Sequence, residues 1–181
     1  REKTEMTTRD GLPTMTTFMK LTFNFLLPEP ASIHIIDIAH GLSQVCRFAA
    51  QTNKFYSVAQ HSVLVSKLVS KEHARVGLMH DSPEAYIGDM AKPLKRLLPE
   101  YDEVEARIYR AIARQFELPY KIPDEVKEMD ARLLANEGIA VMSEDWRGAQ
   151  YDPDPSLGTI QPLEPREAKK LFLERHQELF G

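Results

Sequence analysis

Apolar residues recur every three or four positions once the prolines at 28 and 30 are passed: Ile38, Leu42, Val45 and Ala49. This spacing is typical of one face of an amphipathic helix. Asp37 stands just before the pattern, where its carboxylate would cap the first turn. The pattern predicts a first helix from about residue 37 to residue 50.

A second helix is predicted to begin after Ser57. Ser57 and Gln60 are three positions apart, which is the arrangement of a capping box. An apolar face follows at helical spacing, made by Val63, Leu64, Leu68 and Val69. His61 is therefore expected one turn into this helix.

The next helix is predicted over residues 72–80 and should end abruptly. Pro83 is poorly tolerated inside a helix but suits a first turn, with Ser82 as the cap. We expect the chain to break after Asp81 and restart, which leaves His80 and Asp81 at a helix end.

Three further helices are predicted: residues 103–116, a helix opened by Pro123, and a terminal amphipathic helix from Pro165. Residues 143–163 contain three prolines and two glycines without a period, and predict a long loop. Residues 1–20 are polar and threonine-rich, and predict an irregular N-terminal arm. The expected fold is all-α, a single compact bundle of about six or seven helices over residues 21–181.

Composition narrows the class of protein. The 181 residues are 43% apolar and 28% charged, which suits one globular domain. A formal net charge of −4 disfavours a protein that coats a nucleic-acid polymer, because such binding needs a basic surface. The lone Cys46 lies in an apolar stretch and is expected to be a buried small residue in a reducing compartment. We find neither a secretory signal nor an apolar run long enough for a membrane, so a cytoplasmic location is expected.

Four polar residues lie in or beside the apolar helices and are candidate metal ligands: His61, His80, Asp81 and Asp130. Imidazole nitrogen together with carboxylate oxygen suits Zn, Mn, Fe, Co or Ni better than Ca. Their separation in the chain means that three helices would have to converge. Each could instead be an ordinary hydrogen-bonded residue, and Asp130 could simply pair with Arg132 or Lys127.

The order of these residues resembles the H...HD...D signature of the HD phosphohydrolases: His61, then Gly77-Leu78-Met79-His80-Asp81, then Asp130. The pair Arg47-Phe48, the stretch 55–62, and Glu84 and Asp89 look like the compact branch of that superfamily. This branch contains bacterial 5'-deoxynucleotidases and short phage dATP triphosphohydrolases. The resemblance covers residues 37–142, the motif core of the predicted HD domain.

The resemblance implies one divalent transition metal ion, Zn, Co or Mn, on His61, His80, Asp81 and Asp130, with Mg at a second site as an option. It implies that Glu84 is an acid/base catalyst, that Asp89 positions or activates water, and that Arg47 contacts the substrate phosphate. The residues also allow plainer interpretations: Glu84 as a first-turn acid favoured by the helix dipole, Asp89 as the cap of a helix at Met90, and Arg47 in a surface ion pair.

Other residues near the motif are candidates for substrate binding. Lys92 and Lys95 could add positive contacts or be solvated helix residues. Phe48 could stack on a nucleobase, with Ala49 and Ala50 leaving room beside it and Pro93 closing a flat slot. Many relatives look more polar or glycine-containing after the matching aromatic residue. Trp146 and Tyr151 fall in the irregular segment, which could be a lid, an interface or a plain loop.

The predicted function is hydrolysis of 2'-deoxynucleotides, deoxyadenosine nucleotides above all, from dATP, dADP or dAMP to deoxyadenosine and phosphates. The first alternative is a 5'-deoxynucleotidase for monophosphates, and the second is a non-catalytic metal- and nucleotide-binding regulatory module. A cyclic-nucleotide or alarmone hydrolase would usually bring more ligands or flanking sequence. The expected partner is a small deoxynucleotide, with no membrane and no nucleic-acid polymer. The resemblance also implies a homo-oligomer, and the host cytoplasm if the gene is carried by a phage. The terminal helix could form that interface or complete the core.

Overall fold

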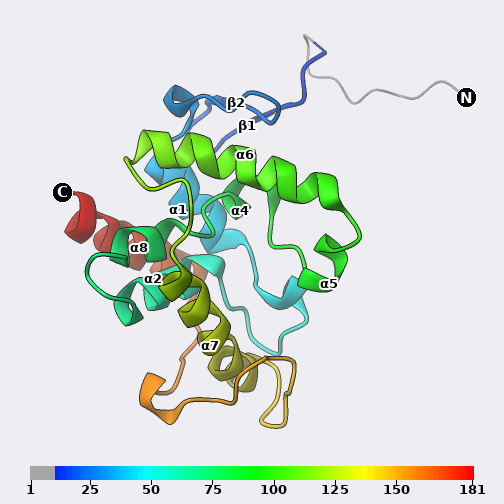
Figure 1. Cartoon of the computed structure of the whole chain (residues 1–181), viewed down its shortest axis with the longest axis vertical. Helices are drawn as coiled ribbons and strands as arrows, with labels where there is room; N and C mark the ends of the chain where they lie inside the picture. Colours follow the sequence, from blue (N-terminus) through cyan, green and yellow to red (C-terminus); the bar gives the residue numbers. More distant parts are fainter. Residues whose placement is uncertain (1–10) are drawn as a thin grey trace, which may run out of the picture.

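Helices account for most of the regular structure in residues 11–181, the part of the chain that the computed structural model describes (Figure 1). The all-α prediction is confirmed. Two of the helices are single turns, and the bounds are as follows: α1 Ile35–Gln44, α2 Val58–Leu68, α3 Ala74–Met79, α4 Glu84–Ile87, α5 Lys92–Lys95, α6 Pro99–Gln115, α7 Asp124–Val141 and α8 Pro165–Phe180. Short 3-10 turns occupy Pro30–Ser32, Phe48–Ala50 and Pro155–Leu157.

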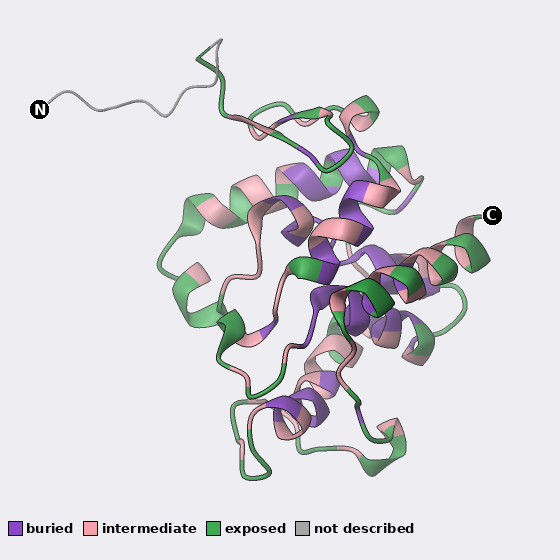
Figure 2. Ribbon diagram, turned by 180° about the vertical axis from the view of Figure 1, so that it is seen from behind, coloured by how far each residue is buried: buried purple, intermediate pink, exposed green. Residues whose placement is uncertain are grey.

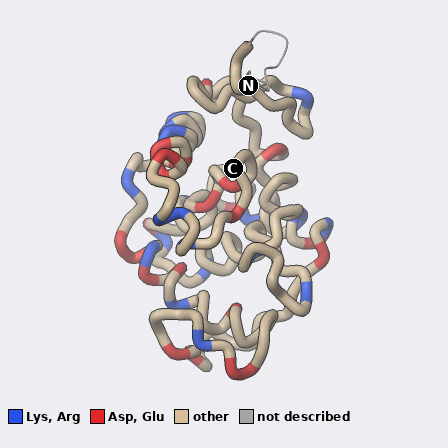
Figure 3. Tube along the Cα trace, turned by 90° about the vertical axis from the view of Figure 1, so that its right-hand side faces the viewer, with Lys and Arg blue, Asp and Glu red and all other residues tan. Residues whose placement is uncertain are grey.

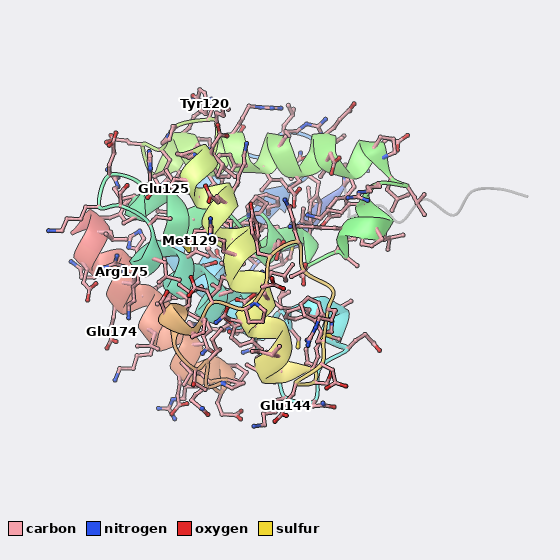
Figure 4. The ribbon with its side chains drawn as sticks, turned by 60° about the horizontal axis from the view of Figure 1, so that its bottom comes forward. Tyr120, Glu125, Met129, Glu144, Glu174 and Arg175 are labelled. Carbon is pink, nitrogen blue, oxygen red and sulfur yellow. The ribbon has the colours of Figure 1, made fainter. Side chains whose placement is uncertain are left out.

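The core is built around α2, which packs against α1, α3, α7 and α8. Buried positions gather in the middle of the bundle, and the outer faces of the helices are exposed (Figure 2). Helix α8 completes this core, because Ala168 and Phe172 are fully buried. Arg175 fastens α8 to α2 by donating to the side-chain and backbone oxygens of Ser66, at 3.0 and 2.8 Å. Figure 4 shows Arg175 on α8, with α7 crossing the bundle through Glu125 and Met129.

A small β-hairpin lies beyond α6, at the opposite end of the molecule from the end of α7 (Figure 1). Strands β1 (Thr14–Thr16) and β2 (Thr22–Asn24) pair antiparallel. Phe23 is fully buried and stacks on Tyr86 with ring centroids 4.0 Å apart. The prediction of an irregular arm over residues 1–20 is therefore wrong for β1, since a three-residue strand is too short to reveal its period. Residues 11–13 and 17–20 are irregular as predicted, and the part of the prediction for residues 1–10 lies outside the described residues.

The first predicted helix is six residues too long at its C-terminal end. Helix α1 ends at Gln44, and Phe48, Ala49 and Ala50 have positive φ of 57°, 50° and 58°. The cap is His34, whose ring accepts from the Ile36 amide, whereas Asp37 is buried in the first turn and accepts from the Met19 amide at 2.7 Å. The spacing of apolar residues predicted too long a helix because residues after the end of α1 pack against the same core without being helical.

The chain breaks near Asp81 as predicted, but of the two predicted serine caps only the one at Ser57 is observed. Ser57 caps α2 by accepting from the Gln60 amide at 3.2 Å, as predicted. The Gln60 side chain bonds residues 161 and 163 instead of closing the capping box. Ser82 donates to the Met79 carbonyl and does not cap α4, so that prediction is wrong.

The remaining predictions hold with small shifts. Helix α6 begins at Pro99, four residues early, and α7 follows Pro123 as expected. Apart from the 3-10 turn, residues 143–163 are irregular. Cys46, expected to be buried, is only half-buried. Within the described residues, every helix is too short or too polar to cross a bilayer.

Candidate metal centre and adjoining cavity

Three polar side chains from separate helices meet at one point of the core. His61 comes from α2, His80 from the end of α3 and Asp130 from α7, and their ligand atoms lie within 4.8 Å of one another. The His61 Nε2 atom is 3.3 Å from His80 Nε2 and 3.2 Å from Asp130 Oδ1. The predicted convergence of three helices is thus observed.

Asp81 adds a fourth donor to this cluster. Its Oδ2 atom lies 3.1 Å from His80 Nε2 and 3.4 Å from His61 Nε2. Donors about 2.1 Å from a shared ion would be roughly 3.0–3.4 Å apart in octahedral or tetrahedral geometry. The observed separations match, and a cation between the two imidazole nitrogens would satisfy both lone pairs. The donor set therefore fits a metal ion.

The carboxylates of this cluster are held in the anionic form. Burial alone would raise the pKa of Asp81, but His80 and His61 lower it to about 2. Burial also opposes ionisation of Asp130, yet its contacts with His61 hold its pKa well below the ordinary range. Both aspartates are thus present as carboxylate anions at neutral pH. Arg132 pairs with Glu128, and Lys127 pairs with Asp124. The alternative prediction, in which Asp130 simply pairs with Arg132 or Lys127, is therefore wrong.

Arg47 lies directly beside the cluster and is buried. The alternative prediction, which placed it in a surface ion pair, is therefore wrong. Its Nη2 atom is 3.0 Å from Glu137 Oε2 and 3.8 Å from Asp130 Oδ1, and its Nη1 atom is 3.5 Å from Asp81 Oδ2. Burial disfavours the charged form, but Glu137 and then the two aspartates outweigh it and raise the pKa of Arg47. A permanent cation therefore stands next to the candidate metal ligands.

Glu137 is a site residue that the sequence reasoning missed. It lies on α7, seven residues after Asp130, and is fully buried. Its Oε1 atom accepts from the Tyr56 hydroxyl at 2.7 Å and contacts His61 Nδ1 at 2.6 Å. Burial would raise the pKa of Glu137, but Arg47 and His61 lower it. The sequence did contain a signal for Glu137, because it lies on the same helix face as the apolar Leu133 and Val141. An acid on such a face needs a buried partner.

A cavity of about 330 Å³ opens beside the cluster. Its lining is partly charged and partly apolar. All seven of the predicted catalytic and substrate-binding residues line it, and the full lining is Arg47, Phe48, Ala49, Asp81, Glu84, Asp89, Met90, Ala91, Lys92, Pro93, Lys95, Asp130, Leu134, Met142, Trp146 and Gly148.

Two acids in the cavity differ from the candidate metal ligands Asp81 and Asp130, because their pKa values are raised and not lowered. Glu84 begins α4 and is buried, and its Oε2 atom lacks a hydrogen-bond partner among the described residues. Burial, Asp81 and Asp89 raise the pKa of Glu84 well above its ordinary value. Burial and Asp81 also raise the pKa of Asp89. Asp89 does not cap a helix at Met90, because α5 begins only at Lys92, so that interpretation is wrong.

The two lysines differ in how free they are. Lys92 is largely exposed, and its Nζ atom lies 3.7 Å from Asp130 Oδ2. Lys95 is held by Glu105 at 2.7 Å and lies over the Tyr101 ring. Lys92 is therefore the lysine that can turn toward a ligand in the cavity.

The apolar side is closed by Phe48 and Trp146, whose rings meet edge to face with centroids 5.5 Å apart. Trp146 lies on the bare backbone of Gly138, where an added Cβ would come within 2.0 Å of its ring. Part of the irregular segment 143–163 is thus a wall of the cavity. Tyr151 contacts Arg132 instead and does not line it.

The fold and site define an all-α protein with a candidate metal centre beside a half-apolar cavity. No protein-family model matches the sequence. YfdR of Escherichia coli K12, an uncharacterized protein, is 42% identical over 150 residues, which cover 81% of this chain and 84% of YfdR. An uncharacterized protein of Rhodobacter capsulatus is 36% identical over 177 residues, 86% of this chain and 90% of that protein. The chain belongs to the same family as these two proteins.

Proposed function

We propose that the protein is a divalent-metal-dependent phosphohydrolase of the HD superfamily that acts on small 2'-deoxynucleotides. The observation that carries the proposal is the meeting of three features at one cavity. These are the histidine and aspartate cluster, whose Asp81 and Asp130 line the cavity, the buried cation Arg47, and the buried acid Glu84 with a raised pKa. A purely binding module would not need such an acid beside the metal centre.

The metal would be held by His61, His80, Asp81 and Asp130, and we propose Zn, Co or Mn because two of the donors are imidazoles. When bound, such an ion lowers the pKa of a water molecule and stabilises negative charge on phosphoryl oxygens. The two anionic aspartates would offset most of its charge.

Arg47 and Lys92 would bind the phosphate. Arg47 is within 4 Å of the candidate ligands Asp81 and Asp130, so its guanidinium reaches the place where a phosphate beside the metal would lie. Lys92 faces the same place from α5. A guanidinium suits this task because its planar donors match two phosphate oxygens at once.

Glu84 and Asp89 would move the protons. As water attacks phosphorus, the bond from phosphorus to the leaving oxygen breaks, and that oxygen takes the proton that Glu84 carries. Asp89 accepts the proton that the attacking water loses. Both roles agree with their raised pKa values, since an acid/base group works best when its pKa lies near the operating pH.

The nucleoside would occupy the apolar side, between Phe48, Pro93 and Trp146. Flat aromatic surfaces bind a base by stacking. A deoxyadenosine nucleotide, including dATP, is the substrate that we propose first. The alternative is a 5'-deoxynucleotidase, which is favoured by the engagement of Lys95 with Glu105, because Arg47 and Lys92 alone suffice for one phosphate.

Product analysis tests the proposal. Metal-free protein is incubated with Mn, Co, Zn or Mg and each deoxynucleoside mono-, di- and triphosphate, and the products are separated by chromatography. We expect turnover that requires a transition metal, is lost in Asp81→Ala, and is kept in Asp152→Ala, which removes an exposed carboxylate outside the cavity. Conversion of dATP to deoxyadenosine supports the first assignment, and turnover of monophosphates alone supports the second. Absence of turnover with every metal would overturn both in favour of a binding module.

A further inference from the structure

Glu137 makes three contacts at the back of the metal centre with a single carboxylate. One oxygen meets both His61 Nδ1, at 2.6 Å, and the Tyr56 hydroxyl, at 2.7 Å, and the other lies 3.0 Å from Arg47 Nη2. Glu137 does not line the cavity and is fully buried, so it cannot touch a substrate there. Of its three partners, Arg47 lines the cavity and His61 would hold the metal, whereas Tyr56 does neither.

We propose that Glu137 is the positioning residue of this centre, orienting His61 for the metal and holding Arg47 back from the metal's carboxylates. The inference rests on the proposed metal site, but not on the reaction proposed for it. Two separate consequences of the geometry support it, one for each carboxylate oxygen.

The first consequence concerns the ring of His61. When Nδ1–H donates to Glu137, the lone pair available to a metal is on Nε2, and a carboxylate partner makes that nitrogen a better ligand. Nε2 is the atom that faces His80 Nε2 and Asp130 Oδ1. Glu137 thus selects the ring orientation and tautomer that the cluster needs.

The second consequence concerns Arg47, which is surrounded by three carboxylates. Its shortest contact, 3.0 Å, is with Glu137, while Asp81 and Asp130 are at 3.5 and 3.8 Å. Without the charge on Glu137, the buried guanidinium would have only the two metal ligands to pair with. It would then compete with the cation for the oxygens of Asp81 and Asp130.

Glu137→Gln tests both consequences at nearly constant volume. Binding of Co²⁺ to metal-free protein is measured by calorimetry, and the electronic spectrum of the Co²⁺-loaded protein reports the ligand arrangement. Loss of such a supporting partner typically weakens metal binding by about 10–100-fold. We expect a loss in this range and an altered Co²⁺ spectrum.

Tyr56→Phe is the matched control. It removes the other hydrogen bond to the same Oε1 atom but leaves the carboxylate charge and its contacts with His61 and Arg47. A purely structural role for the buried carboxylate predicts that Tyr56→Phe and Glu137→Gln weaken Co²⁺ binding alike. A positioning role predicts near-parental affinity, within about twofold, for Tyr56→Phe alone.

Glu137→Asp is the second variant, and it keeps the charge while withdrawing the carboxylate from His61 by one methylene. We expect weaker Co²⁺ binding here too. Parental affinity and spectrum in either folded Glu137 variant would overturn the proposal, with folding checked by circular dichroism. If the parent hydrolyses no nucleotide while both variants lose Co²⁺ affinity, the proposed reaction fails and the role of Glu137 stands.

Discussion

At the residue scale, the cavity is lined by acids whose pKa values are shifted in opposite directions. The histidines lower the pKa values of Asp81 and Asp130, whereas burial and the acidic neighbours Asp81 and Asp89 raise the pKa of Glu84. A chain that only needed stability would not bury Glu84 in this way. The catalytic role proposed for Glu84 would therefore be gained at the expense of stability.

Glu84→Gln should separate the two effects. Because its folded-state pKa is raised above the ordinary 4.5, ionising Glu84 destabilises the native metal-free protein as pH rises above that value. The variant cannot ionise, so its unfolding free energy should exceed the parent's by an amount that grows as pH rises above the ordinary pKa of 4.5. Denaturant melts of the metal-free proteins across this range measure the difference.

The same variant should lose activity, by about 10²–10⁴-fold in kcat, since the leaving oxygen no longer receives a proton. Glu105→Gln is a suitable comparison because Glu105 lies outside this cavity. A Glu84→Gln enzyme with parental kcat, or with unchanged stability at every pH, would contradict this account of Glu84.

The turn that follows Arg47 carries backbone strain. Residues 48–50 are three successive non-glycine residues with positive φ, and such a conformation costs roughly 1–2 kcal/mol per residue. This turn aims Arg47 at the metal centre and Phe48 into the cavity. We expect Ala50→Gly to stabilise the protein by about 0.5–1 kcal/mol, because glycine adopts this φ without a Cβ clash but loses more chain entropy on folding.

Ala50 suits this test because it is exposed and does not line the cavity, so activity should be unchanged. Thermal or denaturant unfolding measures the stability, and Gln44→Gly, at an exposed position in the last turn of α1, should destabilise instead. A destabilising effect of Ala50→Gly would show that the turn is not strained.

At the element scale, α7 contributes most to the site. It supplies the candidate ligand Asp130, the supporting Glu137 and the bare surface of Gly138 on which Trp146 lies. Asp130 and Glu137 are seven residues apart, two turns along one face. A single helix therefore links the metal centre to the apolar wall of the cavity.

Gly138→Ala should move that wall. The added Cβ would lie 2.0 Å from the Trp146 ring, so the indole must leave its seat. The helix itself gains up to about 1 kcal/mol from the exchange of glycine for alanine. We therefore expect a several-fold rise in KM for nucleotides with little change in kcat, measured by steady-state kinetics.

Trp146→Leu provides the comparison, since it removes the ring without disturbing α7, and it should raise KM in the same way. Turnover of an alkyl phosphate substrate, which lacks a base, should be affected by neither substitution. A change in kcat with KM intact would argue against a role of Trp146 in holding the base.

At the scale of the whole molecule, the candidate ligands tie together segments distant in sequence. The ligands on α2, the α3 end and α7 are separated by up to 69 residues, from His61 to Asp130. Acidic and basic positions are interspersed along the chain trace in Figure 3. A bound ion would act as a cross-link through the core.

Metal removal should consequently lower global stability. At a free Co²⁺ concentration about 100 times the dissociation constant, binding adds about 2.7 kcal/mol, which for a chain of this size is roughly 5–10 °C in Tm. Chelation should remove this gain and re-addition should restore it, as followed by thermal unfolding. Asp130→Ala should melt at the same temperature with and without Co²⁺, and a metal-dependent shift that persists in this variant would place the ion elsewhere.

The sequence by itself determined the all-α class, the break after Asp81 and the likeness of His61, His80, Asp81 and Asp130 to a metal-ligand signature. These features are local, because helical period and proline chemistry act over a few residues. The tertiary structure decided where those four residues meet, and it added Glu137 and Trp146 to the site. Their roles depend on contacts with residues far away in the chain, as does the left-handed turn at residues 48–50. Local pattern cannot encode these because the folded core, and not the neighbouring residues, determines which buried polar group finds a partner.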